Sequence, residues 1–442
     1  MIALKNLFKL STPIFYFLLT ISSPSYSAQS IYTWKHTPQK KILPNGIPLI
    51  YHHDESSPIT VLQVLVKGGK GAVPEGKEGL AYLTTRLTIE IPDQGKALKL
   101  MKQASSISIQ CKGDFSLISI QCISSNLDET LNVMTKILRD PLFSGLRIDL
   151  IKEHMNYKIK SAEDDSVIMG HNAHLTSFFG KTGYGGSIYG TEESLKSIKK
   201  KDIQSFYKKY FNTANMILSV SSDLNEEELI ETIQKYFLEF HSGEPEEFSS
   251  SRGSIPEERN IFMEKDTKQT LVSIAFPLPK LSTRNTVMAF MLENLLGKSV
   301  NSKLWFLRSK EKLAYNVNSQ ATQMKEGGIL NSYLETENNK KDRSLEALKK
   351  VLQTLYEEGI TEEELEATKV NSKASFLRIN EIKETRTSNL AFFEAVGLGY
   401  EFINQFFVEV DNTSLEEINS YIKDILDPNK AVEVIIGPKP NE

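Results

Sequence analysis

The sequence predicts an α+β protein built from two homologous domains, in each of which helices pack on a mostly antiparallel sheet. Three observations lead to this fold class. The 442 residues are more than a single hydrophobic core usually accommodates. A polar stretch at residues 241–258 is rich in Ser, Pro, Gly and Glu and divides the chain into parts of similar size. The two parts end on the same pattern, a helix, a polar turn and a strand, over residues 203–222 and 415–437.

Strand-like runs open the two parts at residues 59–66 and 270–276, and amphipathic helical stretches follow them. Three helix starts carry capping signals: Thr361 with Glu364, Thr413 with Glu416, and Thr191. We therefore expect an N-terminal domain at residues 30–240, a linker at 241–258 and a C-terminal domain at 259–442.

The two cysteines lie in a predicted hairpin, residues 106–124, that turns at Gly113-Asp114. With that turn, Cys111 pairs near Ser116 and Cys122 near Ser105, which separates the thiols by roughly 20 Å at about 3.3 Å per residue. A disulfide needs Cα atoms within about 7 Å. We expect two free, largely buried thiols.

The charge balance excludes an obvious nucleic-acid surface. The formal net charge is -4, and the cluster of lysines at residues 199–201 sits in a mixed-charge helical stretch. A solvated helix face explains these lysines better than a basic groove does.

The N-terminus has the layout of a secretory signal peptide, residues 1–27. Lys5 and Lys9 precede an apolar run at residues 13–21, and Ser25-Tyr26-Ser27 fits a cleavage site. That run is short for a permanent membrane span, and no later segment reaches such a length. We expect an exported protein of the periplasm, without a stable membrane span.

Residues 67–93 read KGGKGAVPEGKEGLAYLTTRLTIEIPD. This stretch resembles the insulinase/pitrilysin superfamily of zinc peptidases, in its short, mitochondrial-processing-peptidase-like form. In that family a helix carries H-x-x-E-H, two zinc ligands and a general base. Here Tyr82, Thr85 and Arg86 stand at those positions. The family's third ligand is a Glu about 70 residues on, where this chain has Tyr157 or Lys158.

Each replacement removes a property that zinc chemistry needs. A phenol with a pKa near 10 is a poor ligand at neutral pH, and threonine cannot act as a general base. Arginine stays cationic and has no lone pair to donate. The resemblance therefore implies no zinc in this chain and zinc on a partner subunit.

Two other histidine clusters are candidate metal sites. His171 and His174 are three residues apart, and residues 52–55 read His-His-Asp-Glu. Each cluster lacks a further ligand at a convincing spacing, and a catalytic zinc has three protein ligands. We interpret these histidines as surface or satisfied core residues.

The second half carries the rest of the resemblance. Residues 295–318 read LLGKSVNSKLWFLRSKEKLAYNVN, and the family segment has an Arg and a Tyr seven residues apart, here Arg308 and Tyr315. In the family these side chains hold the substrate backbone and the oxyanion. Lys312 departs from a usual Gly, and Lys303 from the Arg of a Ser-Arg-Leu start.

The resemblance implies a non-metal-binding subunit of a heterodimeric zinc peptidase, which forms half of a clamshell chamber and holds an extended peptide substrate. A non-proteolytic peptide-binding or scaffold protein with the same fold stays open, because fold alone does not fix function. An independent hydrolase has no Ser/His/Asp or Cys/His context to support it.

Overall fold

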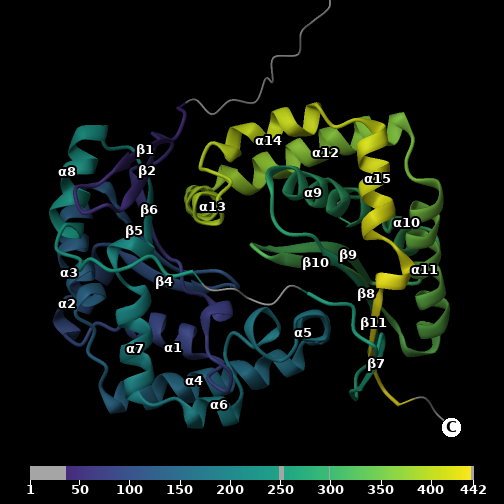
Figure 1. Ribbon diagram of the computed structural model, residues 1–442, viewed down its shortest axis with the longest axis horizontal. Helices are drawn as coiled ribbons and strands as arrows, with labels where there is room; N and C mark the ends of the chain where they lie inside the picture. The colour runs from purple at the N-terminus through teal and green to yellow at the C-terminus, as the bar shows by residue number, and fades with distance from the viewer. Residues whose placement is uncertain (1–35, 248–252, 298, 440–442) are drawn as a thin grey trace, which may run out of the picture.

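The computed structural model describes residues 36–247, 253–297 and 299–439 and contains two β-sheets (Figure 1). The predicted signal peptide lies outside the described residues. Within the described residues, no helix is long and apolar enough to cross a membrane.

The first sheet has six strands in the order β1-β2-β6-β3-β5-β4, and only β2 and β6 pair in parallel. Its strands are β1 Gln39–Ile42, β2 Pro48–His53, β3 Ile59–Val66, β4 Ser106–Cys111, β5 Ser116–Ile123 and β6 Met216–Ser222. The central strands β3 and β6 are buried almost throughout, as expected for strands covered on both faces. The strand β4 forms one edge of the sheet.

Eight helices belong to the first half of the chain within the described range: α1 Leu80–Leu87, α2 Gln94–Lys102, α3 Leu127–Arg139, α4 Gly145–Asp164, α5 Ser166–Phe179, α6 Glu192–Ser197, α7 Lys200–Tyr210 and α8 Glu226–Phe237. Helices α1 and α3 pack on β5, and α1 also contacts α4 and α7. These contacts cover one face of the first sheet.

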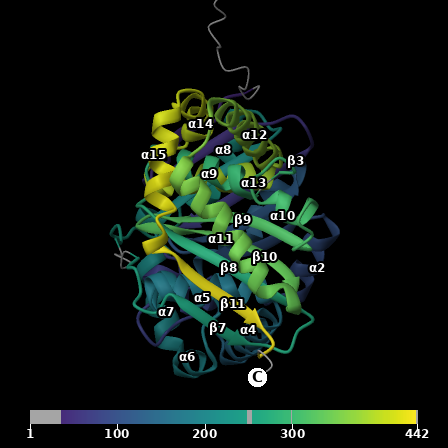
Figure 2. The same ribbon diagram turned by 90° about the vertical axis from the view of Figure 1, so that its right-hand side faces the viewer.

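The second sheet has five strands in the order β7-β11-β8-β10-β9, with β7 and β11 parallel and the other pairs antiparallel. Its strands are β7 Asn260–Glu264, β8 Gln269–Leu278, β9 Asn316–Met324, β10 Gly327–Glu337 and β11 Val432–Gly437. The helices of this half are α9 Thr283–Gly297, α10 Trp305–Ser309, α11 Lys341–Glu358, α12 Glu362–Glu381, α13 Lys383–Val396, α14 Phe402–Asp411 and α15 Leu415–Ile425. Helix α11 crosses one face of the sheet (Figure 2).

Each half of the chain contributes one helix that packs on the sheet of the other half, and we call α5 and α13 the exchanged helices. Helix α5 of the first half packs on β8 and β11 of the second sheet, and α13 of the second half packs on β3 and β6 of the first sheet (Figure 1). On α5, His174 Nε2 lies 2.8 Å from Ser273 Oγ. A Cβ at Gly170 would lie 2.6 Å from a Leu271 methyl carbon, so glycine lets α5 approach the sheet this closely.

Helix α13 is tied to the first sheet by two buried cations. Lys383 Nζ donates to three carbonyl oxygens around the β2–β3 turn, at 2.8, 2.8 and 3.1 Å. Arg386 forms an ion pair with Asp54, and both side chains are largely buried. Burial raises the pKa of Asp54, but hydrogen bonds from Ser56 and the charges of Arg386 and Lys383 outweigh it and lower the pKa to about 2.

The predicted α+β class is confirmed, and most expected elements fall at their predicted positions. The strand at residues 59–66 and the helix at 415–425 have the predicted bounds. In the hairpin, Cys111 lies opposite Ser116, and both cysteines are free and buried.

One predicted cap is wrong by one residue. The capping box of α15 is formed by Ser414 with Glu417, whereas Thr413 Oγ1 donates to the Glu409 carbonyl at 2.8 Å. Thr413 is thus engaged with the end of α14, which leaves the next hydroxyl to cap α15. The capping box at Thr361 with Glu364 and the cap at Thr191 are confirmed.

Candidate functional site

Helix α1 carries the three positions where the sequence predicts a lost metal motif. It begins after Gly79, whose φ of 94° is left-handed and favours glycine. A Cβ at this position would also lie 2.8 Å from the Tyr189 carbonyl oxygen. The local sequence therefore fixes where the helix starts and which side chains it presents to α4 and α7.

The side chains at these positions have structural contacts of their own. Tyr82 packs edge-on against the ring of Tyr189, with centroids 4.9 Å apart, and burial raises the pKa of Tyr82. Thr85 is fully buried, and its hydroxyl donates to the Ala81 carbonyl at 2.8 Å. Neither side chain offers a charged or basic ligand to a metal.

Arg86 forms an ion pair with Glu90 one turn later, and Glu90 also accepts from Arg147 Nη1 at 2.9 Å. Two guanidinium groups thus pair with the Glu90 carboxylate. Tyr157, on α4, is 67% exposed. The three α1 positions thus have packing or ion-pair contacts, Tyr157 is exposed on α4, and the four described side chains include no histidine or carboxylate ligand.

The predicted Arg–Tyr pair lies in the second half, on α10 and at the start of β9. Both side chains are exposed; Tyr315 is 56% accessible. The guanidinium of Arg308 stacks 5.0 Å from the Trp305 ring centroid, and Tyr315 Oη donates to Glu337 at 3.2 Å. Neither is a core residue of the isolated chain.

The two departures from the family segment have local explanations. Lys312 adopts a left-handed backbone, φ 53°, where a glycine would be unstrained. Lys303 forms an ion pair with Glu364, the capping residue of α12. Lys303 therefore links the turn between α9 and β9 to α12, whereas Lys312 occupies a backbone conformation that a glycine would adopt more easily.

A cavity of about 620 Å³ lies where the two halves meet. It is bordered by the edge strands of both sheets and by the exchanged helices α5 and α13. Its polar lining is rich in amide side chains: Gln63, Gln110, Gln320, Gln323 and Asn389. None of the six predicted site positions lines this cavity.

The cavity also holds a cluster of titratable groups that the sequence did not single out for this role. Burial lowers the pKa of Lys70 to about 8, and its Nζ donates to the Gly186 carbonyl at 2.9 Å. Burial and the nearby Lys70 lower the pKa of His171 to about 4. Burial raises the pKa of Asp114, which accepts from the Lys325 backbone amide at 3.0 Å. Burial thus shifts the pKa of each of these three groups in the direction that favours its neutral form, and the amide side chains beside them can pair with a polar ligand such as a peptide backbone.

Sequence comparison identifies proteins to which this chain is similar. Residues 197–371 match the family model described as the Peptidase M16 inactive domain. The chain is 23% identical over 402 residues to the "Non-peptidase homolog YmxG" of Helicobacter pylori, an alignment that covers 89% of this chain and 92% of that protein. The chain is thus similar to M16 peptidase family members over most of its length, and residues 197–371 match that family's inactive-domain model. The insulinase-type resemblance predicted from the sequence is thereby confirmed.

Other relatives and solved structures show similar resemblances. A "Probable mitochondrial-processing peptidase subunit beta" of Arabidopsis thaliana is 20% identical over 316 residues, covering 66% of this chain and 58% of that protein. The solved "peptidase M16 inactive domain from Pseudomonas fluorescens" superposes with a TM-score of 0.83 at 17% identity, covering 92% of this chain and 99% of that one. At this identity the structure shows the shared fold alone.

Proposed function

We propose that this chain is the non-metal-binding subunit of a two-chain zinc peptidase and that it contributes Arg308 and Tyr315 to a site whose zinc lies on the partner. One contrast carries the proposal. The metal-motif positions on α1 are engaged in packing and an ion pair, whereas Arg308 on α10 and Tyr315 just before β9 are exposed. An exposed cation and phenol are available to a partner chain and its substrate.

The chemistry of this pair suits peptide hydrolysis. When a zinc-activated water attacks a peptide carbonyl, negative charge develops on the carbonyl oxygen. A guanidinium and a phenol are strong donors that stabilise such an oxyanion. Tyr315 would exchange its hydrogen bond with Glu337, which is 3.2 Å long, for one to the substrate.

The substrate would be an extended peptide. The strand β4 is an edge strand of its sheet, so the backbone groups on its outer side can pair with an added strand. Its side chains alternate between exposed and partly buried over residues 106–110. The neighbouring cavity offers amide side chains to a peptide backbone. We expect this chain and its partner to enclose the peptide, each forming half of the chamber.

A second function is favoured by the relative named as a non-peptidase homologue. A chain that binds peptides or scaffolds an assembly without cleaving them would use the same cavity and edge strand. The two functions differ in whether Arg308 and Tyr315 affect a reaction rate.

The test is native purification followed by peptide hydrolysis assays on the assembled complex. With an H-x-x-E-H partner present, Tyr315→Phe should lower kcat by about 10²- to 10³-fold, the usual effect of losing one oxyanion donor. The control is Tyr157→Phe, which removes an equally exposed hydroxyl outside the segment and should leave kcat unchanged. The scaffold function would be favoured if the chain purified without a partner and hydrolysed no peptide. It would also be favoured if a partner co-purified but Tyr315→Phe left the rate of hydrolysis unchanged.

The export of the chain is part of the proposal. If residues 1–27 are removed on the way to the periplasm, the purified chain should begin at Ala28. N-terminal sequencing of the native protein reports this directly, and an intact Met1 would exclude cleavage.

A further inference from the structure

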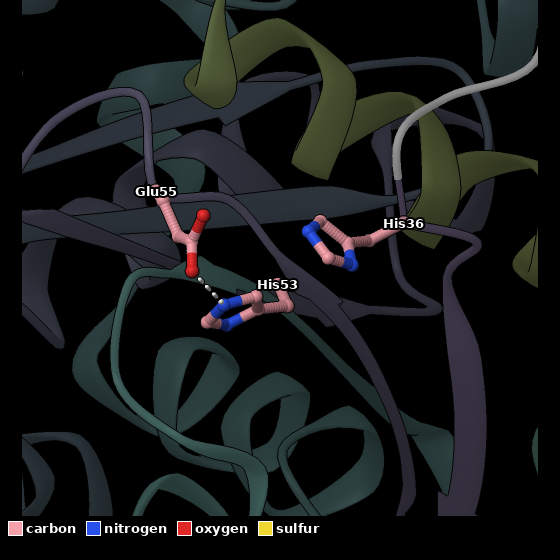
Figure 3. A group of neighbouring side chains, drawn as sticks. All are labelled: His36, His53 and Glu55. Carbon is pink, nitrogen blue, oxygen red and sulfur yellow. Dashed lines mark hydrogen bonds and ion pairs between the residues drawn. The ribbon is translucent and has the colours of Figure 1, made fainter.

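Three potential metal ligands meet at the end of β2, on a different element from the motif positions of α1. His36 precedes β1, His53 is the last residue of β2, and Glu55 follows in the turn (Figure 3). One ligand atom from each lies within 4.8 Å of the other two. His53 and Glu55 are two residues apart in the sequence, whereas His36 is 17 residues before His53. The pairing of β1 with β2 places His36 beside the other two residues.

We propose that His36, His53 and Glu55 form a Zn²⁺ site. Two imidazoles and one carboxylate, with a fourth position left to water, are a ligand set that zinc uses in proteins. The proposal is independent of the peptidase proposal, because it concerns a different part of the chain. It departs from the expectation that this chain holds no metal.

His53 is oriented as a metal ligand. Its Nδ1 lies 3.2 Å from the Leu224 carbonyl oxygen, which can only accept, so Nδ1 carries a proton. In the neutral ring the lone pair is then on Nε2, which lies 3.2 Å from Glu55 Oε1. His53 Nε2 and Glu55 Oε1 would then both be hydrogen-bond acceptors, and two acceptors this close require a cation or a proton between them. A backbone carbonyl on the other ring nitrogen is the usual outer partner of a metal-bound histidine.

His36 supplies a second, independent observation. Its Nε2 is buried and has no hydrogen-bond partner among the described residues. Its ring packs edge-on against that of His53, with centroids 4.9 Å apart. Its backbone is held by His52, whose Nε2 lies 2.9 Å from the His36 carbonyl oxygen. A buried ring nitrogen without a partner is costly, and a bound metal would satisfy it.

The distances fit a zinc ion after a small adjustment. Ligand atoms about 2.0–2.2 Å from a tetrahedral zinc lie roughly 3.3–3.5 Å from one another. The His53–Glu55 pair already has this spacing, and side-chain rotation of His36 would close the remainder. A cavity of about 540 Å³ beside His36 and His53, lined also by Tyr51, Asn225 and Glu226, leaves room for a water ligand.

The bound ion would fasten the segment ahead of β1 to the end of β2. Glu55 directly follows Asp54, which pairs with Arg386 of the exchanged helix α13. Zinc would therefore stabilise the turn on which α13 docks. We expect a rise in thermal stability on adding zinc, since an ion that binds only the folded state stabilises it.

The test is zinc titration of the purified protein by calorimetry, with Co²⁺ absorption as a readout of coordination. One zinc per chain is expected. His53→Asn and His36→Asn should each weaken binding by well over tenfold, since even outer partners of metal ligands contribute about 10- to 100-fold to affinity. His154→Asn is the matched control, because His154 is an exposed histidine on α4, and it should leave affinity unchanged.

Glu55→Gln covers the case in which a histidine variant fails to fold. The Glu55 side chain is 57% exposed, so this variant should fold and still bind zinc at least tenfold more weakly. If zinc does not bind, or if it binds with equal affinity in the wild type, His53→Asn and Glu55→Gln, the site is refuted. The His53–Glu55 contact is then an ion pair held by a proton.

Discussion

Helix α1 and the α10–β9 segment occupy comparable places in the resemblance to zinc peptidases, yet their side chains are used in opposite ways. On α1, Thr85 is fully buried and Arg86 is held by Glu90. On the α10–β9 segment, Arg308 and Tyr315 reach solvent. The difference teaches that Thr85 and Arg86 belong to the contacts of α1, where their replacement should cost stability. The exposed Arg308 and Tyr315 should cost little stability when changed, which leaves them available for the role proposed above.

The largest expected effect is a loss of unfolding free energy at acidic pH. His52 contributes to it from the first sheet, and His174 contributes from its contact with the second sheet. Burial lowers the pKa of His52, on the first sheet, to about 4 and that of His174, against the second sheet, to about 3. Unfolded histidines bind a proton near pH 6.5, so the unfolded state takes up more protons between that pH and the folded pKa values. Stability is full above pH 6.5 and falls with acidification, by roughly 6 kcal/mol at pH 4 from these two histidines.

Urea unfolding at pH 7, 5.5 and 4 measures this effect. His174→Asn should flatten the decline, whereas the exposed control His154→Asn should not alter it. Equal stability at pH 7 and pH 4 would contradict the claim that both histidines have lowered pKa values in the folded protein.

Next in size is Thr85→Glu, which restores the family's general-base residue at a fully buried position. Burial that raises a carboxyl pKa by about three units costs about 4 kcal/mol at neutral pH. Chemical unfolding measures the loss, with Thr85→Ser as the control that keeps the hydroxyl bond to Ala81. A variant as stable as the wild type, or one stabilised by zinc, would show that α1 remains a metal-site scaffold.

Arg386→Ala tests the joint that holds the two halves together. Removing it leaves Asp54 partly buried without its nearest cation, and we expect a loss of about 3 kcal/mol. Arg378→Ala, at an exposed position on α12, is the control and should change stability by less than about 0.5 kcal/mol. Equal effects of the two variants, measured by thermal unfolding, would mean that α13 docks by apolar packing alone.

The smallest effect compares the same residue type in the two regions. Tyr82→Ala should cost about 1–2 kcal/mol, because it removes a half-buried ring that packs on Tyr189. Tyr315→Ala should change stability by about 0.5 kcal/mol or less. Paired melting curves measure both, and a larger cost for Tyr315 would assign it a structural role that the exposed ring does not suggest.

Much of the fold could be predicted from local patterns. The strand at residues 59–66, the β4–β5 hairpin and the cap at Thr361 follow from alternation, turn residues and capping chemistry, which act over a few residues. The cap at Thr413 was misplaced because a contact with the preceding helix α14 decided between two adjacent hydroxyl groups. Local patterns contain no information about such a contact.

By itself, the sequence determined the α+β class, the free cysteines and the absence of H-x-x-E-H chemistry, because each depends on residue type at short spacing. Only the tertiary structure decided that α5 and α13 exchange between the sheets, that amide side chains from both halves line one cavity, and that His36 joins His53 and Glu55. The physical reason is the same in all three cases. These groups are far apart along the chain, and the burial of apolar helix and sheet faces, which brings them together, has no signature at any single position.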